Sequence, residues 1–194
     1  MKPLEISDLW KLEDYADQRP AFKQRVIEHK RPRKVCIGAH FTLLFEDRLT
    51  IQYQIQEMLR IERIFERAAI QEELDAYNPL IPDGKNWKAT LLIEYEDPAV
   101  RQRQLQRLRG VEDAVWAQVG DFPPQIAVAD EDLDRSDAGK TSAVHFMRFE
   151  LAAHAISALR DGAELRFGVS HAQFSDQVLV EAATREALLK DLSG

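Results

Sequence analysis

The chain has 194 residues, of which 45% are hydrophobic, and its 33 acidic and 26 basic side chains give a formal net charge of −7. This composition excludes a disordered chain and a collagen-like fibre, and no stretch reaches the roughly 18 apolar residues that a membrane-spanning helix requires. We therefore expect a single folded domain over residues 1–194, in which residues 1–33 form a helical arm packed on the rest.

The cysteine content and the first residues indicate the cellular compartment. A single cysteine, Cys36, excludes an intramolecular disulfide framework and a four-cysteine zinc site. The first residues contain no apolar export segment. Both observations point to the reducing cytoplasm, and we expect no association with a membrane.

The first half of the chain predicts helices on either side of one strand. Residues 7–31 predict two short helices that separate before Pro20. Alternating apolar residues predict a single strand over residues 34–46. Residues 50–76 contain neither proline nor glycine and predict the longest helix of the chain.

The second half mixes strands and helices without a repeat. The expected strands are 87–95, 114–119, 125–129, 142–149 and 164–170, the expected helices are 98–109, 150–160 and 175–192, and residues 130–139 form an acidic loop. Mixing without a regular β–α–β period favours an α+β fold. We expect a mostly antiparallel sheet of about six strands, one long central helix, and helices at both ends of the chain.

Basic residues concentrate in two clusters, between Arg19 and Lys34 and between Arg101 and Arg109. Such clusters can engage nucleic-acid phosphates, but the net charge of −7 opposes unspecific binding. We interpret both clusters as solvated helix faces that complement the acidic residues of 121–137. A nucleic-acid partner is therefore not expected.

One carboxylate of the long helix falls among apolar residues. At about 100° per residue, one arc of the helix contains Ile51, Ile55, Met58, Leu59, Phe65 and Ala69. Glu62 and Gln54 lie inside this arc, and Glu57 lies at its border. An ionised carboxylate in such surroundings requires a partner. That partner is an arginine in an internal ion pair, a metal ion or substrate held together with Glu57, or another protein at an interface.

Two histidines are placed where strands could bring them together. His145 lies within the expected strand 142–149, and His171 directly follows the expected strand 164–170. If these strands are neighbours, both imidazoles approach one site, and imidazole with carboxylate suits iron, manganese or zinc. The alternative is that each histidine is an ordinary core or surface side chain.

Four stretches of the chain carry a family resemblance: Leu43–Glu66, the Asp134-Arg135 pair, Lys140–Leu151 and Ser170–Phe174. With them the chain resembles, nearly end to end, a bacterial family, the domain of unknown function numbered thirty-five hundred and one. The last stretch departs from the family pattern, because Ala172 and Phe174 stand where that pattern tends toward a proline and a tyrosine.

The resemblance implies a setting and a set of residues. Genes of this family commonly lie beside those for rubrerythrin and for an iron–sulfur protein similar to heterodisulfide reductase, which implies service to a redox or peroxide-handling system. The family motif falls on Gln54, Glu57, Arg60, Glu62, His145, Arg148 and His171.

The sequence therefore leaves two functional hypotheses. The first is an accessory or binding protein of a cytoplasmic redox system, with an iron–sulfur protein or rubrerythrin as partner and a small ligand or divalent metal ion held near a buried glutamate. Glu62 and His145 would bind the metal ion. The expected ligand-binding side chains are Gln54, Arg60, Arg148 and His171. The alternative is a metal-dependent enzyme in which Glu62 and histidines bind a divalent ion and Glu57 acts as general base.

Overall fold

The structure is a computed structural model that describes residues 1–129 and 139–192. Nearly all of the expected acidic loop at 130–139, including the Asp134-Arg135 pair, lies outside the described residues.

Helices and strands are interspersed along the chain. The α-helices are α1 (Leu12–Lys30), α2 (Arg48–Glu62), α3 (Arg67–Tyr77), α4 (Pro98–Arg107), α5 (Ala153–Arg160) and α6 (Ala182–Leu189). The strands are β1 (Lys34–Ile37), β2 (Phe41–Glu46), β3 (Asn86–Ile93), β4 (Val115–Val119), β5 (Gln125–Ile126), β6 (Val128–Ala129), β7 (Val144–Glu150), β8 (Leu165–His171) and β9 (Phe174–Leu179). Short 3-10 helices are η1 (Ile6–Asp8), η2 (Arg31–Arg33), η3 (Asn78–Leu80) and η4 (Val111–Ala114). None of the described helices is both long enough and apolar enough to span a bilayer.

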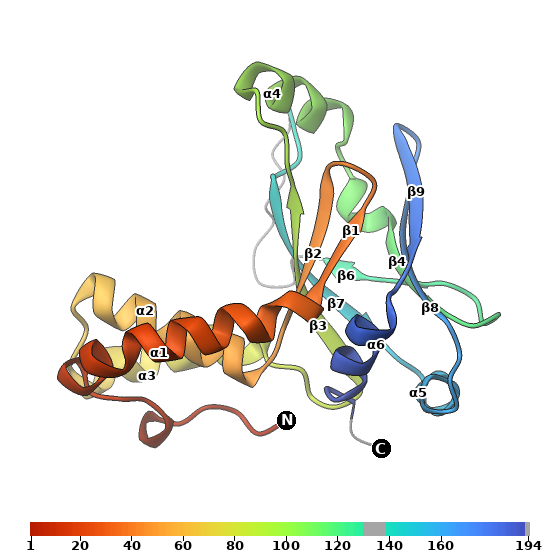
Figure 1. The fold of residues 1–194 in the computed structure, drawn as a ribbon. Helices are drawn as coiled ribbons and strands as arrows, with labels where there is room; N and C mark the ends of the chain where they lie inside the picture. The colour runs from red at the N-terminus through yellow and green to blue at the C-terminus, as the bar shows by residue number, and fades with distance from the viewer. Residues whose placement is uncertain (130–138, 193–194) are drawn as a thin grey trace.

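Two antiparallel sheets form the body of the molecule (Figure 1). Sheet A has the strand order β1-β2-β3-β7-β6, and sheet B has the order β5-β4-β8-β9. The α+β class predicted from the sequence is confirmed. The described strands form two sheets, however, and not the one sheet of about six strands that we expected.

An aromatic cluster between the inner faces of the sheets forms the centre of the core. Phe45 and Phe149 of sheet A have ring centroids 5.0 and 5.2 Å from that of Phe167 in sheet B, and Trp87 lies 5.8 Å from the same ring. All four side chains are at most 2% exposed. Because burying an aromatic side chain contributes about 1.5–3 kcal/mol, this cluster is a main reason why the two sheets stay face to face.

Helices α1, α2 and α3 form an arm that projects sideways from the two sheets (Figure 1). Ile51, Ile55 and Leu59 of α2 pack with Leu74 of α3 in a small core of their own. Phe22 belongs to a second small cluster, formed by α1 together with partly buried side chains of α2. The arm is therefore held by its own apolar contacts, separate from the core between the sheets.

The prediction that the N-terminal helices separate at Pro20 is wrong, because α1 runs unbroken from Leu12 to Lys30. A proline in a helix interior deprives the carbonyl group four residues earlier of its hydrogen-bond donor. Here that residue is Ala16, and both Ala16 and Pro20 are exposed. Water can therefore solvate the carbonyl group that proline leaves without a donor.

The expected strand 34–46 is a hairpin. Ile37 ends β1, Phe41 begins β2, and Gly38 adopts a φ of +61° in the turn between them. The turn holds three residues, so Ile37 and Phe41 are four positions apart and point to the same face. Alternation therefore continues through the turn as if the strand were uninterrupted.

The expected helix 50–76 is two helices. α2 ends at Glu62, Arg63 follows in the left-handed region with a φ of +55°, and α3 begins at Arg67. Left-handed C-caps favour glycine or asparagine. An arginine in that place gives no signal in the sequence, which is why the break was not predicted.

The expected terminal helix 175–192 is partly a strand. Residues Phe174–Leu179 form β9, which pairs with β8 through a tight hairpin, and α6 begins only at Ala182. The middle of β9 consists of three consecutive polar residues, Ser175, Asp176 and Gln177, and all three are exposed. The strand therefore shows neither the alternation nor the apolar run by which a strand is recognised.

Candidate functional site

Glu57 joins the two long helices of the arm. Its carboxylate accepts hydrogen bonds from Arg19 Nε and Nη2 at 2.7 and 2.9 Å and from the Tyr15 hydroxyl at 2.7 Å, all from α1. Arg60, one turn further along α2, adds bonds of 3.4 and 3.2 Å. The side chain of Glu57 is only 16% exposed. Glu57 is thus a half-buried anchor between α1 and α2.

The charges around Glu57 do not suit proton transfer. Hydrogen bonds from Arg19, with weaker help from Tyr15 and Arg60, lower the pKa of Glu57 to about 2 although burial acts in the other direction. An efficient general base has a pKa near the working pH. Both oxygens of Glu57 are also already occupied by donors. The expected role of Glu57 as general base therefore does not fit its surroundings.

The Glu57→Gln variant should unfold more easily than the wild type, by about 1–2 kcal/mol at neutral pH, because it loses the charge-assisted bonds from α1. The expected loss of unfolding free energy is at the low end of the range for charge-assisted hydrogen bonds, because water screens the charge of the partly exposed Arg19. The folded-state pKa of about 2 lies below the ordinary 4.5. The contribution is therefore complete above about pH 4.5 and is lost as the pH falls through about 2. Urea unfolding between pH 7 and pH 2 measures it.

The matched control for this variant is Glu62→Gln, the same change at the exposed end of the same helix. It should alter the unfolding free energy by less than about 0.5 kcal/mol. Equal losses in the two variants would contradict the role given to Glu57.

The expectation that Glu62 is buried among apolar side chains is wrong. Glu62 is the last residue of α2 and is exposed. Gln54, which the same arc contains, is half-buried on α2. Because Glu62 faces water, it needs no metal ion or buried cation to compensate its charge.

His145 is completely buried in β7. Its Nε2 lies 3.0 Å from the Ser142 carbonyl oxygen and 2.9 Å from Thr141 Oγ1, and Thr141 in turn donates to Glu112 at 2.7 Å. Since a carbonyl oxygen only accepts, Nε2 carries the hydrogen atom in this contact. That nitrogen acts as a donor within a polar network and has no lone pair for a metal ion.

His171 lies in a different sheet from His145. It ends β8 in sheet B, where Nδ1 accepts a bond from the Gln173 amide and Nε2 donates to the Arg109 carbonyl oxygen at 3.1 Å. The expected residues of α2 lie in the arm, away from both histidines (Figure 1). Among residues 1–129 and 139–192, no three histidine, cysteine or acidic side chains are grouped so that they could hold a metal ion.

Arg148 occupies a charged row on the outer face of sheet A. Glu46, Lys88 and Arg148 are direct neighbours across β2, β3 and β7, and Arg148 pairs with Glu150. Glu46, Lys88 and Arg148 line a cavity of about 90 Å³, together with Leu80 and other apolar side chains. One carboxylate oxygen of Glu46, Oε2, is buried and has no hydrogen-bond partner among the residues that the structure describes. The cavity is large enough only for a few waters or a very small ligand.

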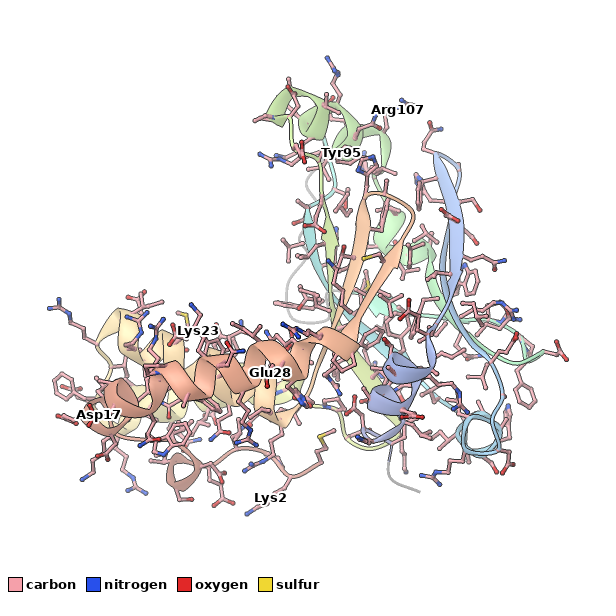
Figure 2. The ribbon with its side chains drawn as sticks, in the orientation of Figure 1. Lys2, Asp17, Lys23, Glu28, Tyr95 and Arg107 are labelled. Carbon is pink, nitrogen blue, oxygen red and sulfur yellow. The ribbon has the colours of Figure 1, made fainter. Side chains whose placement is uncertain are left out.

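A larger groove lies at the other end of sheet A. It has a volume of about 880 Å³ and lies where the β1–β2 turn and the ends of β3 and β7 meet the start of α4. We call it the α4 groove. Figure 2 shows Tyr95 at this end of the sheet, with Arg107 of α4 nearby. The volume is in the range of ordinary ligand sites, and none of the expected site residues lines the groove.

The chain is similar throughout to proteins without an assigned activity. The family model described as "Protein of unknown function (DUF3501)" matches residues 3–192. A crystal structure of a "novel protein of unknown function" from Burkholderia pseudomallei K96243 is 49% identical; the alignment covers 99% of this chain and 100% of that one, with a TM-score of 0.93. No curated protein matches the chain. These similarities establish the family and the fold and name no reaction.

Proposed function

The chain belongs to the DUF3501 family, whose model covers nearly all of it, and from that premise we propose that it is an accessory or binding protein of a cytoplasmic redox or peroxide-handling system. The redox setting comes from the family resemblance, which implies a rubrerythrin or an iron–sulfur protein as partner. The protein's own contribution is to hold a partner or ligand.

The observation that carries this proposal is the α4 groove. The groove has a volume of about 880 Å³, whereas the cavity beside Glu46 has a volume of about 90 Å³. The groove is therefore almost ten times as large. Apolar side chains of the sheet and polar side chains from the adjoining turn and helix both line it. A concave surface with an apolar floor and a few converging polar groups is the usual form of a binding site.

The metal-dependent enzyme has less support. Glu57 is held by two arginines, Glu62 faces water, and His145 and His171 belong to different sheets. The roles assigned to them in that hypothesis require side chains that meet at one reacting centre. Elemental analysis of protein never exposed to chelator separates the hypotheses, because stoichiometric divalent metal that disappears in Glu62→Ala would favour the enzyme.

The proposal predicts a stable complex with a redox partner. Co-expression with rubrerythrin and with the iron–sulfur protein, under anaerobic conditions that keep the cluster intact, should give co-elution of one of them in a fixed ratio during size-exclusion chromatography. A complex with neither partner would contradict the proposal. An unrelated iron–sulfur protein of similar charge serves as the control for unspecific association.

A further inference from the structure

We propose that the α4 groove binds an extended segment of a partner protein through a positively charged side chain, with arginine fitting best. This inference rests on the proposed function and names the chemistry of the partner surface.

An aromatic pair gives the groove a flat surface. His40 from the β1–β2 turn and Tyr95 beyond the end of β3 stack with ring centroids 4.0 Å apart and an angle of 24° between their planes. His40 Nδ1 lies 2.9 Å from the Glu94 carbonyl oxygen. Because that oxygen only accepts, Nδ1 carries the hydrogen atom, and the bond fixes the ring over Tyr95. Planar cations, guanidinium in particular, are attracted to the faces of such rings.

Carboxylates stand next to this aromatic pair. Glu94, Glu96 and Asp97 line the groove, and Arg101 is the only basic side chain among the described residues that line it. Glu94 is held in position by Thr42, whose hydroxyl donates to its carboxylate at 2.7 Å. The groove therefore carries an excess of negative charge, in a chain whose net charge is already −7. A cationic segment is attracted both to the groove and to the molecule as a whole.

The start of α4 does not offset this preference. Helix N-termini often bind anions through their free N–H groups. In α4 the Asp97 side chain already accepts from the Val100 amide at 2.8 Å, and Pro98 has no N–H to offer. The helix end is thus occupied by the protein's own carboxylate, and a phosphate or an acidic peptide finds no favourable place in the groove.

The floor of the groove suits the apolar parts of a peptide. Leu92 is half-buried, and Val144, its direct neighbour across β3 and β7, is 38% exposed. Aliphatic side chains two positions before and after an arginine share its face of an extended peptide, so they can pack against this pair while the guanidinium lies over the aromatic stack. The alternation of side chains in an extended peptide matches the alternation of the sheet beneath it.

The experiment is a titration of the intact protein with the acetylated and amidated pentapeptide LARAL, in which the two leucines share the face of the arginine, followed by amide NMR at Glu94, Tyr95 and Val144. The matched probes replace the arginine by citrulline, which keeps the shape without the charge, or by glutamate. We expect saturable shifts with the arginine peptide, binding weaker by about fivefold to tenfold with citrulline, and no binding with glutamate. Equal binding of the arginine and citrulline peptides would overturn the proposal.

Variants test the same point from the side of the protein. The double variant Glu94→Gln, Glu96→Gln should weaken binding of the arginine peptide by about tenfold, whereas Glu57→Gln, the same chemical change on the arm, should leave it unchanged. If the double variant still forms the full partner complex, the partner docks elsewhere: the inference fails and the proposed function stands. If the peptide binds as expected but no redox partner forms a complex, the proposed function fails and the inference stands.

Discussion

Replacing Arg33 by leucine should lower the free energy of unfolding by about 3–5 kcal/mol, because the change leaves buried carboxylate charge without its partner. Arg33 lies in η2, between the arm and sheet A, and is only 3% exposed. Its guanidinium makes two bonds to Asp191, at 3.2 and 2.5 Å, and lies 3.5 Å from Asp47. Urea unfolding at pH 7 measures the loss.

The surroundings of Arg33 explain why the effect is expected to be large. Its Nε and Nη2 donate to the carbonyl oxygens of Phe45 and Glu46 at 3.1 Å, so the same side chain also satisfies backbone groups. Burial raises the pKa of Asp191 to about 6 even though Arg33 acts to lower it. Removing Arg33 takes away the main group that opposes the effect of burial on the pKa of Asp191 and leaves only His29 acting in that direction. It also deprives Asp47, the N-cap of α2, of a counterion.

The control is the double variant Arg33→Met, Asp191→Leu, which replaces the ion pair by apolar groups of similar size. It should recover a substantial part of the loss, since apolar replacements of buried ion pairs are often neutral. A single Arg33→Leu variant as stable as the wild type would show that the network contributes little to stability. A loss in the double variant as large as that in Arg33→Leu would show that the backbone bonds of Arg33 matter more than its charge.

Sequence patterns were most informative where a local signal and the tertiary structure agree. The start of the expected helix 98–109 is confirmed, because α4 begins at Pro98 and has Asp97 as its N-cap. The apolar side of residues 34–46 is also the buried side of sheet A. In both places the local preference is the one that the fold requires, so short-range reasoning is sufficient.

The candidate site was predicted less well because it depended on the helix continuing to residue 76. The arc that contained Glu62 also included Phe65 and Ala69, which lie beyond the end of α2 at Glu62. Once Arg63 turns the chain, Phe65 leaves the arc and is 74% exposed. The error at Glu62 thus follows directly from the left-handed residue that ends α2.

The histidine pair and the α4 groove depend on contacts between distant parts of the chain. His145 and His171 could share a site only if β7 and β8 were neighbours, yet these strands belong to separate sheets. His40 and Tyr95 meet because β2 pairs with β3, which brings the two ends together. Strand pairing of this kind is not encoded in any local pattern, so periodicity could not have identified the groove.

Replacing Gly168 by alanine should lower the free energy of unfolding by about 3 kcal/mol, at the upper end of what overpacking a core costs. Gly168 in β8 lies directly opposite Trp116 in β4. A Cβ atom at this position would overlap the indole ring of Trp116, which covers the glycine. The backbone of Gly168 is not in the left-handed region, so the requirement for glycine is steric and not conformational.

The indole ring has little freedom to move away. Trp116 is 8% exposed, and its Nε1 donates to Ser170 Oγ at 2.9 Å, so a displacement breaks a bond as well as packing. A double-mutant cycle in urea isolates the clash: with Trp116 already replaced by alanine, Gly168→Ala should cost less than about 0.5 kcal/mol. If the cost of Gly168→Ala is the same in both backgrounds, contact with the indole is not the reason for the glycine. A cost confined to the background that retains Trp116 places the constraint in this cross-strand pair, where the indole ring occupies the space that a Cβ atom at Gly168 would need.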